Sequence, residues 1–291
     1  MTVPARPTPL FEKLPKHSCP HPPPPAAPAP PPAAAVFPAA RLGKPLLVEG
    51  PAGVGKTELA RAVAQATGSG LVRLQCYEGV DEARALYEWN HAKQILRIQA
   101  GSGDWEATKT DVFSEEFLLQ RPLLTAIRRT EPTVLLIDET DKADIEIEGL
   151  LLEVLSDFAV TVPELGTLTA TRAPFVLLTS NATRELSEAL KRRCLYLHID
   201  FPTPELERRI LLSRVPELPE HFAEELVRII GVLRGMQLKK VPSIAETIDW
   251  GRTVLALGLD TIDDAVVAAT LGVVLKHQSD QQRATGELRL N

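Results

Sequence analysis

Residues 50–57 read Gly-Pro-Ala-Gly-Val-Gly-Lys-Thr, and this octapeptide constrains the possible fold more than any other part of the chain. It fits the phosphate-loop pattern of a glycine, four free positions, Gly-Lys and Ser or Thr. Residues 45–49 before it, Pro-Leu-Leu-Val-Glu, predict a short buried strand, and residues 58–65 after it predict a helix that stops at Gly68. Strand, glycine loop and helix in this order are the context in which backbone N–H groups and a helix N-terminus bind a phosphate.

The chemistry expected at this loop is binding of ATP. Lys56 is expected to reach the β- and γ-phosphates, and Thr57 is expected to hold Mg²⁺. A glycine turn before an ordinary helix is the alternative, and the complete pattern with both flanks disfavours it. The loop residues expected to contact the nucleotide are Gly50, Pro51, Ala52, Gly53, Val54, Gly55, Lys56, Thr57 and Glu58.

Strand and helix patterns alternate along residues 33–202, which predicts an α/β domain with a parallel sheet. Five strands are predicted, at residues 45–49, 72–76, 133–137, 175–180 and 195–199. A helix is predicted at 147–158, and residues 160–162 and 167–169 predict a hairpin that projects from the sheet edge. The expected fold is therefore a P-loop NTPase with a five-stranded parallel sheet.

The two ends of the chain differ from this α/β pattern. Fourteen of the 25 prolines lie in the first 40 residues, so residues 1–32 are expected to form a disordered Pro-rich arm. Residues 203–276 have helical spacing only and predict a small all-helical lid domain, in which Ser243 and Glu246 form a capping-box pattern. Residues 277–291 are polar and are expected to form a flexible tail.

Two adjacent carboxylates, Asp138 and Glu139, follow the third predicted strand. Ligands bind at the carboxyl ends of strands in open α/β sheets. Asp138 is therefore expected to hold Mg²⁺ with Thr57 beside the nucleotide, and Glu139 to polarise the attacking water as general base. Asp141 and Asp144 follow in the sequence, and for them a plain role as helix caps is an open alternative.

Polar residues also follow the fourth strand and precede the fifth. Asn181 ends the fourth strand, where its amide could hold the lytic water or contact the γ-phosphate; a turn or capping role is the alternative. A short helix is predicted at 185–193, and it ends in Arg192 and Arg193. These arginines could simply complement the helix dipole, or one of them could act as an arginine finger in a neighbouring subunit's site. We expect Arg193 before Arg192 in that role.

Composition limits the class of protein. The formal net charge of -6 disfavours nucleic acid as the main partner. No apolar run is long enough to span a bilayer, and the N-terminus lacks a secretory signal pattern, so a cytoplasmic location without membrane insertion is expected. The three cysteines have no paired spacing, which disfavours a zinc site or a disulfide framework.

Taken together, the motifs resemble the AAA+ ATPases, and specifically the MoxR family. Residues 139–144, Glu-Thr-Asp-Lys-Ala-Asp, look like the acidic stretch that follows the metal-binding strand in that family. Residues 85–90, 111–115 and 242–250 resemble its CoxD-like branch. The resemblance covers about residues 35–276, and it includes the phosphate loop and the Arg-Arg-Cys segment.

This resemblance implies an ATPase ring, often hexameric, that hydrolyses ATP with Mg²⁺ and acts as a chaperone. It implies a von Willebrand A-domain partner and a metalloenzyme client, such as carbon monoxide dehydrogenase, that the pair matures or activates. Many AAA+ lids carry a sensor arginine early in their third helix. Here Ala245 stands near that place, and Arg252 is a substitute candidate. Relatives also carry a leading helix where this chain has its Pro-rich arm.

Two other functions stay open at this point. A P-loop kinase of a small molecule would need an acceptor pocket, and the pair Asp138-Glu139 with Asn181 is not usual for such enzymes. A nucleotide-dependent scaffold without catalysis is disfavoured by the intact Lys56 and Glu139, whereas Ala245 leaves it open.

Overall fold

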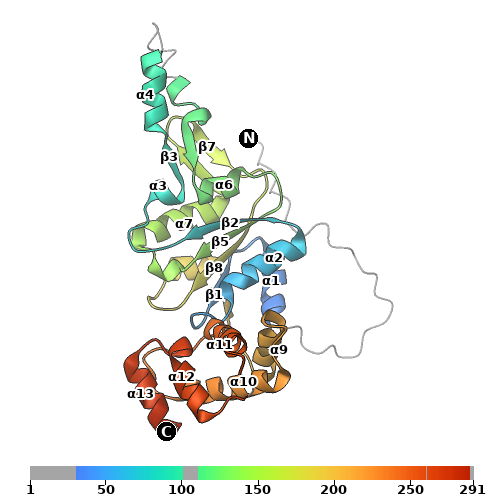
Figure 1. The fold of residues 1–291 in the computed structure, drawn as a ribbon. Coiled ribbons are helices and arrows are strands. Elements are labelled where there is room, and N and C mark those ends of the chain that lie inside the picture. The colour runs from blue at the N-terminus through green and yellow to red at the C-terminus, as the bar shows by residue number, and fades with distance from the viewer. Residues whose placement is uncertain (1–30, 101–110, 260, 289–291) are drawn as a thin grey trace, which may run out of the picture. The chain divides into compact units, whose positions relative to one another are not determined.

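The computed structural model describes residues 31–100, 111–259 and 261–288 (Figure 1). Contacts divide the chain into two compact units. The first contains Lys56–Ile199 together with the described residues up to Gly50, and the second contains Pro51–Gly55 together with the described residues from Asp200 onward. The domain limits expected from the sequence, 33–202 for the α/β domain and 203–276 for the helical lid, remain predictions.

A five-stranded parallel sheet forms the centre of the first unit, in the order β2-β5-β8-β1-β9. Its strands are β1 (Leu46–Glu49), β2 (Gly70–Gln75), β5 (Thr133–Asp138), β8 (Phe175–Ser180) and β9 (Leu195–His198). Every residue of β5 and β8 is buried, as expected for parallel strands that are covered on both faces. The predicted fold class is confirmed.

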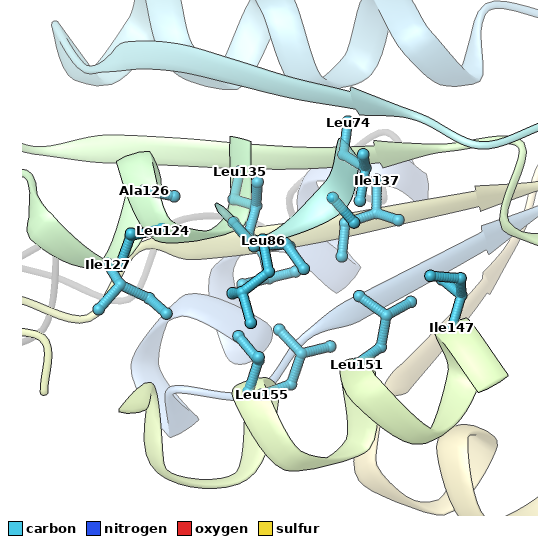
Figure 2. Packing of buried hydrophobic residues seen from close by; sticks show 14 of the residues in the cluster. Leu74, Leu86, Leu124, Ala126, Ile127, Leu135, Ile137, Ile147, Leu151 and Leu155 are labelled. Atoms are coloured by element: carbon cyan, nitrogen blue, oxygen red, sulfur yellow. The ribbon is translucent and has the colours of Figure 1, made fainter. Parts of the chain in front are cut away.

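Helices and two apolar clusters cover the two faces of this sheet. The helices of the first unit that pack around it are α1 (Pro31–Leu42), α2 (Lys56–Thr67), α6 (Pro122–Arg128), α7 (Ile145–Asp157) and α8 (Glu188–Arg193). Successive residues of β5 join opposite clusters: Leu135 and Ile137 belong to one, Val134 and Leu136 to the other. Figure 2 shows the first of these clusters, with Leu151 of α7 directed toward the sheet. Because Leu151 is fully buried, its truncation to alanine should cost about 2–5 kcal/mol.

Smaller elements lie between β2 and β5. They are α3 (Glu82–Ala85), β3 (Tyr87–Trp89), α4 (His91–Ala100), the 3-10 turn η1 (Glu115–Phe117) and β4 (Leu118–Gln120), with β3 and β4 paired antiparallel. These elements have no counterpart among the strands and helices expected from the sequence. The hairpin expected at 160–162 and 167–169 is present as β6 (Ala159–Val162) and β7 (Gly166–Thr169).

The second unit is helical apart from its turns and loops. Its helices are α9 (Pro204–Arg214), α10 (Glu220–Gly235), α11 (Ile244–Ala256), α12 (Asp264–Val274) and α13 (Gln278–Glu287). Trp250 of α11 is fully buried in their common core. The predicted capping box is formed, because the backbone N–H of Ser243 donates to Glu246 Oε2 at 2.9 Å. None of the helices in the described part of the chain is long and apolar enough to cross a membrane.

Three expectations about boundaries need correction. The tail at 277–291 contains α13, which is ordered because Asp280 accepts hydrogen bonds from the backbone of Lys239 and Lys240 while Ala284 is buried. The Pro-rich arm was expected to end at residue 32, but helix α1 already begins at Pro31. Proline is tolerated in the first turn of a helix. The rest of the arm lies outside the described residues. The helix expected at 185–193 begins only at Glu188, after the cap residue Ser187.

Candidate nucleotide site

The phosphate loop joins β1 to α2, and its backbone requires glycine. Gly50 has φ 154°, and a Cβ placed there would lie 1.9 Å from the carbonyl oxygen of Ile199. Gly55 has φ 99°, in the region that disfavours side chains. Helix α2 then begins at Lys56, so its unpaired N–H groups directly follow the loop. This local backbone is suited to binding an anion.

Four of the predicted site residues come together at one end of the sheet. Lys56 Nζ donates to Asn181 Oδ1 at 2.8 Å and to the carbonyl oxygen of Gly50 at 2.7 Å. Thr57 Oγ1 lies 3.1 Å from Asp138 Oδ1. The cause is topological: β5 and β8 are parallel neighbours, so Asp138 and Asn181 leave the sheet at the same edge.

Asp138 is buried and has several hydrogen-bond partners. Thr179 Oγ1 donates to its Oδ1 at 2.5 Å, and a guanidinium nitrogen of Arg73 lies 2.6 Å from its Oδ2. A buried carboxylate is costly unless charged or polar groups compensate it. Here Thr57, Thr179 and Arg73 supply that compensation.

Glu139 occupies a strained backbone position directly after β5. Its φ of 56° and ψ of 48° are left-handed, which is uncommon for residues other than glycine and is often found at functional sites. Its N–H donates to Thr179 Oγ1 at 2.9 Å. Its Oε2 accepts from Gln75 Nε2 at 3.0 Å and from Lys142 Nζ at 2.6 Å. The carboxylate is therefore held by two neighbouring side chains.

The two later aspartates have different roles in the structure. Asp144 is the N-cap of α7, accepting from the N–H of Ile147 at 3.1 Å, as the plain alternative expected. Asp141 caps no long helix; it accepts from the N–H groups of Asn181 and Thr183, at 3.2 and 3.0 Å, and so fixes the loop after β8. Burial raises the pKa of Asp141, but the hydrogen bonds from Thr183 and Asn181 outweigh it and leave the pKa below its ordinary value.

Lys56 is buried among carboxylates. Burial lowers the pKa of its amine, and the negative charges of Asp141, Asp138 and Glu139 act against that shift. A phosphate would add further negative charge near this amine and favour its protonated form.

Arg192 and Arg193 do not join this group of residues. Both are exposed, and neither forms an ion pair with any residue in the described part of the chain. They end α8, directly before β9, whose first N–H donates to the carbonyl oxygen of Pro45 ahead of β1. They therefore lie near the end of the sheet where its parallel strands begin. The four residues of β9 span about 13 Å from that end to the end where the strands finish.

Three contacts of the site were not foreseen from the sequence. Arg73 and Gln75 lie on β2, and Thr179 lies on β8, all beside Asp138 or Glu139. Alternate residues of a strand share a face, so the spacing of Arg73 and Gln75 is the signal that could have found them. That signal is usable only when the neighbour of β2 is known to be β5.

The residues present fit a magnesium ion. The Thr57 hydroxyl and the Asp138 carboxylate are oxygen donors about 3 Å apart. Mg²⁺ in nucleotide enzymes is commonly held by one or two such side chains together with phosphate oxygens and water. A third protein ligand is therefore not required.

The family of the chain follows from a sequence profile. The profile of the AAA domain, dynein-related subfamily, matches residues 45–194, more than half of the 291 residues. The chain belongs to the AAA family. An AAA domain is an ATPase domain, so residues 45–194 are identified as one. The matched segment of this AAA chain includes the phosphate loop, Asp138, Glu139, Asn181 and both candidate arginines.

Curated relatives of this AAA chain include ClpB chaperones. Chaperone protein ClpB 1 of Synechocystis sp. is 27% identical over 236 residues, which are 76% of this chain and 23% of the relative. ClpB 2 of Thermosynechococcus vestitus is 33% identical over 152 residues, 51% of this chain and 15% of the relative. The chain thus spans a quarter or less of the length of these relatives. A RuvB mutant of Thermotoga maritima is among the similar solved structures, at 17% identity and a TM-score of 0.49, covering 89% of this chain and 68% of that one.

Proposed function

We propose that this AAA chain is a MoxR-type ATPase of the CoxD-like branch that uses ATP hydrolysis to remodel a protein client. The observation that carries the proposal is the convergence of Lys56, Thr57, Asp138 and Asn181 at the carboxyl edge of one sheet. A phosphate loop beside a strand-end carboxylate is the arrangement that binds and cleaves a nucleoside triphosphate. The resemblance of residues 85–90, 111–115 and 242–250 supports the finer assignment.

The side chains have separate roles in this proposal. Lys56 and the loop N–H groups bind the β- and γ-phosphates, and Thr57 and Asp138 would hold Mg²⁺, which neutralises phosphate charge when bound. Glu139 accepts a proton from the attacking water, whose oxygen bonds to the γ-phosphorus while the bond from that phosphorus to the ADP oxygen breaks, and ADP and phosphate are released. Asn181 orients that water or the γ-phosphate, and Asp141 fixes its loop.

The two oxygens of the Glu139 carboxylate differ in their contacts. Oε2 accepts hydrogen bonds from Gln75 Nε2 and Lys142 Nζ, and these contacts orient the carboxylate. Oε1 has no hydrogen-bond partner among the described residues, so it is the oxygen proposed to accept the proton of the attacking water.

Arg193, or else Arg192, acts in the site of a neighbouring protomer. Both residues are exposed, and α8, which they end, precedes β9, whereas Asp138 stands at the end of β5, so we propose that they act on a second copy. An arginine supplied in this way stabilises charge on the transferring phosphoryl group and can raise turnover by about 10³–10⁵. AAA domains generally act as rings, and a hexamer is the form proposed here.

The partners proposed are those implied by the MoxR resemblance. They are a von Willebrand A-domain protein and a metalloenzyme client, in the cytoplasm, and the net charge of -6 argues against nucleic acid as the client. ClpB relatives are named as chaperones, which agrees with a remodelling role.

Replacing the proposed base tests the hydrolytic function. Glu139→Gln should still bind ATP, while phosphate release should fall by about 10²–10⁴. The assay is phosphate release together with binding of a fluorescent ATP analogue, and Glu153→Gln on α7 is a matched control that should behave as the natural chain. Unchanged turnover in Glu139→Gln would remove Glu139 from this role. Phosphate that appears on an added metabolite instead of in solution would favour a small-molecule kinase.

A further inference from the structure

Arg73 is the one charged residue of strand β2, and it forms an ion pair with a buried carboxylate. Strand β2 is an edge strand of the five-stranded sheet, and the Arg73 side chain remains 46% exposed. Even so, its Nη2 lies 2.6 Å from Oδ2 of Asp138, whose side chain is 4% exposed. A solvent-facing cation is thus paired with the carboxylate that we propose as a metal ligand.

The two oxygens of Asp138 have different partners. Oδ1 accepts from Thr179 at 2.5 Å and from Thr57 at 3.1 Å. Oδ2 has its short contact with Arg73, and Thr57 lies farther from it at 3.3 Å. The two hydroxyls are neutral, so within residues 31–100, 111–259 and 261–288 Arg73 is the cation that forms an ion pair with this carboxylate.

Arg73 is also linked to the proposed general base. Its Nη2 donates to Gln75 Oε1, and Gln75 Nε2 donates to Glu139 Oε2 at 3.0 Å. The link exists because residues two apart on a strand share a face, and because Gln75 is in register with Asp138 across the β2–β5 pair. One guanidinium therefore contacts the groups around both carboxylates.

The exposure of Arg73 decides what kind of pair this is. A buried carboxylate without a counter-charge is strongly disfavoured, so Asp138 needs a cation whenever no metal is bound. A fully buried arginine could not leave without a large cost, whereas a half-exposed one on an edge strand can move into water cheaply. The geometry is that of a replaceable counter-ion.

We propose that Arg73 is a positioning residue that neutralises Asp138 in the nucleotide-free protein and competes with the divalent cation for Oδ2. The inference rests on the proposed role of Asp138 as a metal ligand. Metal loading then requires Arg73 to leave Oδ2, which also frees its hydrogen bond to Gln75. The natural chain therefore needs a higher metal concentration to fill the site than a chain without this guanidinium.

Metal binding can be measured without turnover. Mn²⁺ is titrated into the full chain with an equimolar non-hydrolysable ATP analogue, and the free Mn²⁺ signal is followed by electron paramagnetic resonance. A titration of the analogue alone corrects for the Mn²⁺ that the triphosphate binds in solution. Arg73→Gln should lower the Mn²⁺ concentration at half-saturation by about threefold to tenfold, as expected for loss of a half-exposed, charge-assisted contact. Arg73→Lys keeps a charge near Asp138 and should stay within about twofold of the natural chain.

Lys142→Met is the matched control. It removes a cation that contacts Glu139 and makes no contact with Asp138 among the described residues, so the half-saturation for Mn²⁺ should not fall. An Arg73→Gln variant with unchanged or weaker Mn²⁺ binding contradicts the inference. An equal gain in Lys142→Met also contradicts it, because the effect would then be general electrostatics.

Asp138→Asn separates this inference from the proposed function. In one outcome the natural chain binds Mn²⁺, Asp138→Asn does not bind it, and Arg73→Gln has the same half-saturation as the natural chain. In that case only the role of Arg73 is wrong. If Asp138→Asn binds Mn²⁺ as well as the natural chain, the metal role of Asp138 and the inference are both wrong.

Discussion

The ion pair between Arg234 and Glu207 offers a sharp test of how the helical unit is held together. Arg234 lies on α10 and Glu207 on α9, with side chains 13% and 2% exposed. The pair is bidentate, at 2.5 and 2.8 Å, and Glu207 also accepts from Thr247 of α11 at 2.8 Å. One carboxylate therefore joins three helices of the unit.

Arg234→Met keeps much of the apolar side-chain length and removes the charge. Glu207 would then be buried with Thr247 as its remaining side-chain donor among the described residues. Breaking a buried pair by removing one partner costs about 3–5 kcal/mol, because an uncompensated charge stays behind. Loss of the hydrogen bond to the carbonyl oxygen of Pro242 acts in the same direction.

The same helix carries its own control. Arg228 pairs with Glu225 at 2.6 Å, with side chains 64% and 36% exposed, and exposed pairs at this spacing contribute about 0.5 kcal/mol or less. The assay is urea unfolding of the full chain followed by tryptophan fluorescence, since Trp250 is buried in this unit. Glu207→Gln added to Arg234→Met removes the stranded charge and should restore part of the loss. Equal losses in the free energy of unfolding for Arg234→Met and Arg228→Met would contradict a large cost of leaving Glu207 buried without its partner.

Three further predictions follow from the candidate site. Lys56→Ala should abolish binding of a fluorescent ATP analogue while the fold, measured by circular dichroism, is retained, because the lysine supplies the charge that faces the phosphates. Thr179→Val should lower the free energy of unfolding by about 1–3 kcal/mol, since its hydroxyl donates to a buried carboxylate and accepts from the N–H of Glu139. The pKa of Asp141 lies below its ordinary value because hydrogen bonds from Thr183 and Asn181 outweigh the effect of burial, so the stabilisation is present above the ordinary aspartate pKa of about 4 and is lost as the pH falls further. Urea titrations at several pH values should therefore show a shallower acid loss in Asp141→Asn than in the natural chain.

The fold was predictable where the sequence pattern is local. The strand at β5 is a continuous apolar run because it is buried on both faces, and the phosphate loop fixes β1 and α2 around it. Helix α13 could not be predicted in this way: its sequence is polar, and its order depends on Asp280 binding backbone N–H groups about 40 residues earlier.

In the candidate site, too, some positions could be predicted from local sequence and others depend on contacts between distant residues. Asn181 could be expected next to Asp138 from the sequence because the carboxyl ends of neighbouring parallel strands meet, and β5 and β8 are such neighbours. Its hydrogen bond from Lys56, at 2.8 Å, was not part of that expectation. Arg73 could not, because an arginine on a strand reads as a solvent-facing residue until the neighbour of that strand is known. Asp141 was open between a cap and a site residue, and only the hydrogen bonds to the loop after β8 distinguish these roles.

The most direct test of the account is a mixing experiment between two inactive variants. Glu139→Gln lacks the base and keeps both arginines, whereas Arg193→Ala keeps the base and lacks the proposed finger. If two protomers build each site, mixed assemblies contain some subunit interfaces with an intact base and an intact arginine. ATP turnover should then reappear and be greatest at intermediate ratios of the two variants. The same mixture with Arg192→Ala covers the second candidate. Assemblies shown to contain both variants, by co-purification through a tag on one of them, yet without any recovered turnover for either arginine, would contradict a site shared between neighbouring chains.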